Sequence, residues 1–161
     1  LGFPIGTRGQ MFYLNPERPN ALAPRKRPRA TLTPSLVTRN GMPYMVFGTP
    51  GGDIQDQVTL QFFLNYVEFG MNIQEALDAP TVFSNHFPSS FYPRDSYPGY
   101  VIADGRISQN VITELQKRGH IINNSEKWIG GKPMGIRLHQ DKGIIIGGAS
   151  TKGNIGYAIG W

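Results

Sequence analysis

The stretch GTPGGDIQDQVTLQFFLNYVEFG (residues 48–70) combines a glycine turn with a long periodic segment. The run before it, residues 44–47, is apolar throughout, which indicates a central strand covered on both faces. Apolar residues then recur at helical spacing from Gln55 to Phe69, and additional leucines widen the apolar stripe. The stretch therefore predicts a strand, a turn, and a helix that is buried around much of its circumference.

The turn holds two glycines, Gly51 and Gly52, and two acids, Asp53 and Asp56. Acids at a helix start cap free amides and complement the helix dipole, so we interpret both as helix-start residues rather than as catalytic carboxylates. The turn lacks the Gly-Lys-Ser/Thr ending and the glycine spacing of phosphate-binding loops. Adjacent glycines at such a junction leave backbone N–H groups open to a ligand, which suits a developing oxyanion, although most glycine pairs form only turns.

Turn and capping signals divide the rest of the chain into short elements. Asn40-Gly41 predicts a hairpin turn, and Asn72 with Glu75 predicts the capped start of a short helix that ends before Pro80. The other predicted elements are extended segments at 11–14 and 81–92, hairpin strands at 33–38 and 43–49, a helix from 108 to 118, and strands at 134–139 and 143–148. This order predicts one α+β domain over residues 1–161, layered on an antiparallel sheet.

Composition excludes several kinds of site. The 161 residues include no cysteine, which removes disulfides, thiolate catalysis and Cys-zinc sites. His86, His120 and His139 show no metal-ligand spacing, so neither a metal nor another cofactor is expected. The net charge of +5 is partly due to the basic run at residues 25–29, which predicts a solvated surface, with nucleic-acid binding as a minor alternative. No apolar run is long enough to predict a membrane span.

Two motifs, taken together, point to one family. The run KRPRATLTPSLV (residues 26–37) and the run FGTPGG (47–52) are similar to the K-R-P-x-S-S-x-S-P segment and the G-S-P-G-G loop of gamma-glutamyltranspeptidases. GTRG (6–9) and GMNIQEALDAP (70–80) resemble further segments of that family. The resemblance covers nearly the whole chain in the expected order and weakens after Pro80.

The resemblance implies an N-terminal-nucleophile hydrolase with a four-layer αββα sandwich of antiparallel sheets, shared between a large and a small subunit made by self-cleavage. The chain would form most of the small subunit, and the nucleophilic threonine that begins that subunit would lie upstream of Leu1. Its hydroxyl, activated by its own α-amine, attacks an amide and forms an acyl-enzyme. The implied partners are a small-molecule amide substrate and the large subunit of the same precursor, with an oligomer of such pairs possible.

The resemblance also assigns residues to the substrate. Gly51 and Gly52 match the glycines whose amides hold the oxyanion. Ala30 and Thr31 match a serine pair that binds the glutamyl α-carboxylate, so one of the two hydroxyls is missing.

The acid that grips the glutamyl α-amine in that family falls near Arg18, with Asn15 and Glu17 beside it. An arginine repels an ammonium group and attracts a carboxylate. Glutaryl-cephalosporin acylases and oxamate amidohydrolase-like enzymes, which cleave amides of acids without that amine, are therefore alternatives to a glutamyl-specific enzyme. A family member without catalysis is a further alternative.

Overall fold

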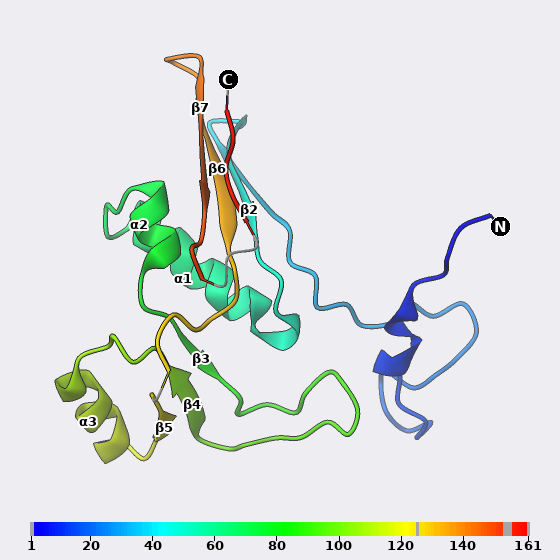
Figure 1. The fold of residues 1–161 in the computed structure, drawn as a ribbon. Helices are drawn as coiled ribbons and strands as arrows, with labels where there is room; N and C mark the ends of the chain where they lie inside the picture. The colour runs from blue at the N-terminus through cyan, green and yellow to red at the C-terminus, as the bar shows by residue number, and fades with distance from the viewer. Residues whose placement is uncertain (1, 125, 153–155, 161) are drawn as a thin grey trace.

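The computed structural model describes residues 2–124, 126–152 and 156–160 and contains two β-sheets (Figure 1). The larger sheet has the order β1-β2-β6-β7, and every neighbouring pair is antiparallel. Its strands are β1 (Ser35–Arg39), β2 (Met42–Gly48), β6 (Met134–His139) and β7 (Ile144–Ala149). The smaller sheet comprises β3 (Val82–Ser84), β4 (Tyr100–Ala103) and β5 (Ile121–Asn123), and the helix α3 (Gln109–Lys117) connects its parallel pair, β4 and β5.

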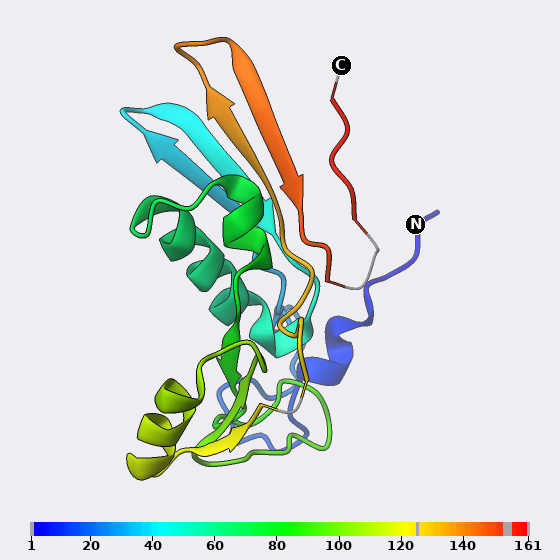
Figure 2. The same ribbon diagram turned by 60° about the vertical axis from the view of Figure 1, so that its left-hand side comes forward.

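Two helices, α1 (Gln55–Val67) and α2 (Ile73–Asp78), cover one face of the larger sheet (Figure 2). Glycines in the sheet let them approach closely, because a Cβ at Gly135 would lie 2.9 Å from the Phe62 ring and one at Gly148 would lie 2.8 Å from Leu77. The buried core between the layers consists of Met45, Phe62, Ile73, Ala76 and Leu77.

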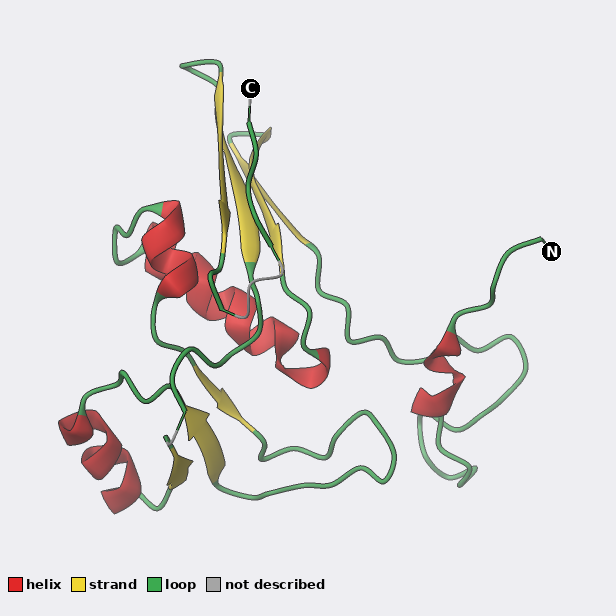
Figure 3. Cartoon of the chain, viewed as in Figure 1, coloured by secondary structure: helices red, strands yellow, loops and turns green. Residues whose placement is uncertain are grey.

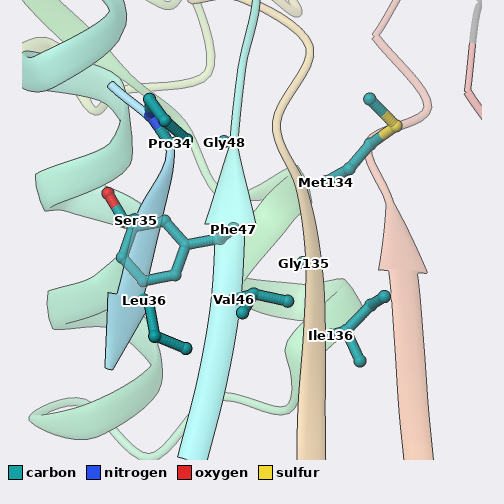
Figure 4. Close-up of a pocket in the computed structure, with 9 residues that line it drawn as sticks. All are labelled: Pro34, Ser35, Leu36, Val46, Phe47, Gly48, Met134, Gly135 and Ile136. Carbon is teal, nitrogen blue, oxygen red and sulfur yellow. The ribbon is translucent and has the colours of Figure 1, made fainter. Parts of the chain in front are cut away.

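The opposite face of this sheet carries a pocket whose lining includes Leu36, Val46 and Ile136 (Figure 4). Side chains on it are apolar yet exposed: Leu36 at 63%, Met134 at 43% and Ile136 at 42%. The predicted covering of β2 on both faces is therefore not met within this chain. The prediction for α1 is also wrong here, because Leu60 is 57% exposed.

The turn and the helix cap predicted from neighbouring residues are confirmed. The Asn40-Gly41 turn has φ angles of 53° and 76°, and Asn72 and Glu75 form a reciprocal capping box. Ser108 occupies the N-cap position of α3, but its side chain makes no capping hydrogen bond. The extended segment predicted at 11–14 forms only after the 3-10 helix η1 (Thr7–Met11) ends, with Phe12 extended and Tyr13 in an isolated β-bridge to Ala21.

Of the smaller sheet, only β3 lies in a segment predicted to be extended. The pairing of β4 with β5 is parallel, whereas the sequence predicts an antiparallel sheet. Figure 3 shows the smaller sheet below the helical layer. Two glutamines of α1 join the two by bonding the backbone of β3. Gln57 pairs with both the N–H and the carbonyl of Ser84 at 2.8 and 3.1 Å, and Gln61 pairs likewise with Val82 at 3.0 and 2.6 Å. A strand of three residues is thus held by side chains as well as by its neighbour.

Near the end of β7, a buried polar cluster joins the two sheets. Asp104, fully buried, forms a two-oxygen ion pair with Arg106. Lys152, which is 3% exposed, donates to the Ala79 carbonyl at 3.2 Å and to the Thr81 hydroxyl at 2.8 Å. Burial, together with the charge of Arg106, lowers the pKa of Lys152 to about 8.

Candidate functional site

The loop before α1 has a conformation that only glycine adopts readily. Gly51 has φ 146° and Gly52 has φ 60°, and the short helix η2 (Gly52–Ile54) leads from them into α1. A Cβ at Gly51 would lie 2.9 Å from Ile54, and one at Gly52 would lie 3.2 Å from the Phe91 ring. Among the residues that the structure describes, none accepts a hydrogen bond from the Gly51 N–H. Gly51 itself is exposed.

A buried glutamine connects this loop to the upstream motif. The side chain of Gln55, 6% exposed, is oriented by the groups around it. Its nitrogen donates to the carbonyls of Thr31 at 3.1 Å and Thr49 at 3.0 Å, and its oxygen accepts from the Gly52 N–H at 3.2 Å. The two motifs that resemble one family therefore meet at a single side chain, which holds the Gly52 amide in place.

Arg8 also belongs to this site, at Thr31, although it is not among the predicted site residues. Its guanidinium donates to the Thr31 hydroxyl at 3.2 Å across 23 residues of sequence. Thr31 is 7% exposed and Arg8 is half-buried, so a cation stands next to the predicted carboxylate-binding hydroxyl. The signal was available, because Arg8 is the arginine of the GTRG turn.

The two acids of the loop behave differently. Asp56 lies in the first turn of α1, as predicted, and its side chain accepts from the Gln57 N–H at 2.9 Å. Asp53 lies in η2 but does not cap it, because its carboxylate accepts from the Ser90 N–H at 2.7 Å and from the Ser89 hydroxyl at 3.2 Å. Burial alone would raise the pKa of Asp53, but these hydrogen bonds and the charge of Arg29 hold it below its usual range. Asp53 is thus an anion that ties two loops together.

The other predicted substrate residues lie further out. Asn15, Arg18 and Ala30 are exposed. Asn15 accepts from the Glu17 N–H, and the Arg18 guanidinium lies 5.6 Å from the centre of the Tyr13 ring. No contact among the described residues links Asn15 or Arg18 to Thr31, so only Thr31 is joined to the glycine loop.

Hydroxyl–base pairs occur among the described residues, since Thr151 donates to Asp78 at 3.1 Å and Ser89 to Asp53 at 3.2 Å. A third pair, Lys152 and Thr81, is buried on both sides. No group of three potential metal ligands occurs among the described residues, and no described helix is long and apolar enough to cross a membrane. What the site offers is a backbone donor, a hydroxyl and a cation.

Comparison with known proteins identifies the family. Residues 2–161 match the family model described as gamma-glutamyltranspeptidase. The chain belongs to the gamma-glutamyltranspeptidase family. Members of the family similar to this chain include glutathione hydrolases, and the α+β fold with antiparallel sheets matches solved structures of the family.

Three proteins similar to this chain illustrate the match. The glutathione hydrolase-like YwrD proenzyme of Bacillus subtilis (strain 168) is 29% identical over 99% of this chain and 29% of its own length. The structure of LmbA2991T421A is 44% identical, with a TM-score of 0.91, over 99% of this chain and 28% of that one. The cephalosporin acylase from Bacillus halodurans is 30% identical, with a TM-score of 0.77, over 90% and 25%. The chain therefore spans less than a third of the length of these relatives.

Proposed function

We propose that the complete protein is an amidohydrolase or acyltransferase of the gamma-glutamyltranspeptidase type, with a nucleophilic threonine that precedes Leu1. The threonine hydroxyl attacks the substrate carbonyl while the α-amine takes its proton, and that proton then leaves with the amine product. Water or a second amine releases the acyl group from the threonine. This chain supplies the groups that bind the oxyanion and the acyl chain.

The observation that carries the proposal is the single connected set formed by the glycine loop, Gln55, Thr31 and Arg8. The Gly51 N–H is a fixed donor for the oxyanion of the tetrahedral intermediate. The Gly52 N–H is engaged by Gln55, so we assign it to holding the loop as well as to the oxyanion. A preorganised donor of this kind contributes about 3–4 kcal/mol to transition-state stabilisation.

Arg8 narrows the class of acyl donor. A guanidinium next to the Thr31 hydroxyl suits a free carboxylate on the acyl group, which γ-glutamyl amides, glutaryl amides and oxamate all carry. Arg18, near the position of the family's amine-binding acid, opposes an ammonium and so favours a glutaryl amide or oxamate as a second, narrower candidate. The similarity to a cephalosporin acylase is consistent with this choice. Asn15 and Arg18, both exposed, are left as candidates for contacts with the outer part of the substrate.

We also propose that the open face of the larger sheet packs on a second sheet from the large subunit of the same precursor, which completes the four-layer sandwich. Leu36 and Ile136 are the kind of side chains that a sheet-on-sheet interface buries. Ile136→Asp should prevent the two parts from copurifying, whereas Ile121→Asp, on the small sheet and also exposed, should leave them together. Copurification of the Ile136 variant would contradict this packing.

The test of activity uses the complete protein with γ-glutamyl and glutaryl anilides and with oxamate. Replacing the threonine before Leu1 by Ala should abolish turnover, and Gly51→Ala should reduce kcat about 100-fold or more. Gly70→Ala is the matched control, because Gly70 also has positive φ (68°) but lies in open space. Turnover that survives the threonine replacement would overturn the mechanism. Absence of turnover on every amide would favour a family member without catalysis.

A further inference from the structure

The long loop between β3 and β4 reaches from the smaller sheet toward the N-terminal segment in both ribbon views (Figures 1 and 2). Neither the sequence motifs nor the proposed chemistry uses this loop. Its middle part, residues 89–94, nevertheless contacts both the glycine loop and the segment that carries Arg8. We call residues 89–94 the bridging segment.

The first end of the bridging segment is fixed to the glycine loop. The Asp53 carboxylate accepts from the Ser90 N–H and the Ser89 hydroxyl, and the low pKa of Asp53 keeps these bonds charge-assisted. Ser90 is 1% exposed, so its end of the contact is shielded from solvent. The Phe91 ring lies against the position that a Cβ on Gly52 would occupy, at 3.2 Å. Movement of the bridging segment would therefore disturb the glycine loop directly.

The second end is fixed to the N-terminal segment by Arg94. One guanidinium nitrogen donates to the carbonyls of Met11 at 3.1 Å and Phe12 at 2.9 Å, with a longer contact to Gln10 at 3.4 Å. The other terminal nitrogen donates to the Ser90 carbonyl at 2.8 Å, within the bridging segment. The guanidinium also stacks over the Tyr13 ring, 3.9 Å from its centre. These carbonyls begin two residues after Arg8, so Arg94 holds the end of the short helix that presents Arg8.

We propose that Arg94 and Asp53 are positioning residues that set the separation between the Arg8 guanidinium and the glycine loop. This inference rests on the proposed function, because it takes Arg8 as the partner of the acyl carboxylate. Arg8 itself has one hydrogen bond to the core of the site, through Thr31, which does not fix a flexible side chain and its helix alone. The bridging segment supplies the remaining restraint from the opposite side. A misplacement of about 1 Å at such a site reduces turnover by up to about 100-fold.

The test compares two anilides that differ only in the acyl carboxylate, glutaryl anilide and pentanoyl anilide, with the complete protein. Arg94→Ala should lower kcat/KM for glutaryl anilide about 10- to 100-fold, mostly through KM, and change pentanoyl anilide less than about threefold. Arg94→Lys should show the same selectivity at smaller loss of stability, because an ammonium cannot span the carbonyls that the guanidinium fork reaches. Arg39→Ala is the control, since the exposed Arg39 guanidinium also lies over an aromatic ring, 5.7 Å from the centre of Tyr44, on the larger sheet.

A double-mutant cycle decides whether Arg94 acts through Arg8. In an Arg8→Ala background, Arg94→Ala should cause no further loss on glutaryl anilide. Equal losses on both anilides, or additive losses in the cycle, would overturn the proposal and leave Arg94 as an ordinary structural residue.

A binding measurement separates this inference from the proposed chemistry. Glutarate should bind the protein whose upstream threonine is replaced by Ala about 10-fold more tightly than it binds the same protein carrying Arg94→Ala, measured by calorimetry. If glutarate binding shows this difference while neither anilide is turned over, the positioning role stands and the proposed reaction falls. Equal glutarate affinity in the two proteins would refute the positioning role, whatever the activity.

Discussion

Replacing Gln55 by Leu tests the link between the two family motifs. The substitution places an apolar side chain of similar size in a 6% exposed position and removes three hydrogen bonds. It leaves the carbonyls of Thr31 and Thr49 and the N–H of Gly52 without their partner, and the two threonines are 7% and 9% exposed. At about 1 kcal/mol for each lost bond, the free energy of unfolding should fall by about 3 kcal/mol.

The same change should reach the chemistry, because the Gly52 amide is the group that Gln55 orients. We expect kcat on the preferred amide to fall by about 10-fold or more at a temperature where the variant is folded. Gln61→Leu is the matched control, because Gln61 also makes three backbone hydrogen bonds from α1, to Gln57 and Val82, but on the side of the smaller sheet.

Urea unfolding and steady-state kinetics on the complete protein measure both quantities. Gln61→Leu should lose a similar or smaller amount of stability, since its site is less buried, and keep its kcat within about twofold of the wild type. If Gln55→Leu loses less than about 0.5 kcal/mol, the three bonds are not made as assigned. If both variants lose kcat equally, the loss reflects general loosening of α1 and not the glycine loop.

Three further predictions concern the rest of the fold, each measured by chemical unfolding. Burial lowers the pKa of Lys152 from 10.5 to about 8, so between these pH values the unfolded chain holds a proton on this amine that the folded chain has lost. The free energy of unfolding should therefore rise from pH 8 to 10.5, by up to ~3 kcal/mol, and Lys152→Met should remove that rise. Asn72→Ala breaks the reciprocal box with Glu75 and should cost about 1 kcal/mol, while an unchanged midpoint would show that the box adds nothing. Gly135→Ala places a Cβ 2.9 Å from the Phe62 ring and should cost about 1–3 kcal/mol; a neutral effect would mean that the helix layer shifts freely.

The sequence predicted the parts of the molecule whose causes are close together in the chain. The Asn72 box and the Asn40-Gly41 turn involve residues within three positions of one another. Arg8 was missed because its partner lies 23 residues away, so the GTRG turn indicates the segment but not the contact with Thr31. Asp53 was read as a helix-start acid for the same reason, since its partners are 36 and 37 residues downstream.

The short strands of the smaller sheet explain why most of it could not be predicted from the sequence. β3 and β5 have three residues each and β4 has four, which is too short for alternation of apolar and polar side chains to be recognised. Their stability comes from distant groups, such as Gln57 and Gln61 of α1, rather than from their own pattern. The parallel pairing of β4 and β5 depends on the crossover through α3, which is visible only when both strands are known.

The two wrong burial predictions have a common physical meaning. An apolar pattern records burial in the whole protein, whereas exposure measured on this chain records only the neighbours that the chain itself provides. Leu36 and Ile136, on one face of the larger sheet, are exposed, as is Leu60 of α1. Exposed apolar side chains on a sheet face are what a sheet packed on a second sheet would present, and the chain covers less than a third of the YwrD proenzyme and of LmbA2991T421A. The sequence pattern thus supports the proposed packing on a partner subunit at the points where it disagrees with the isolated chain.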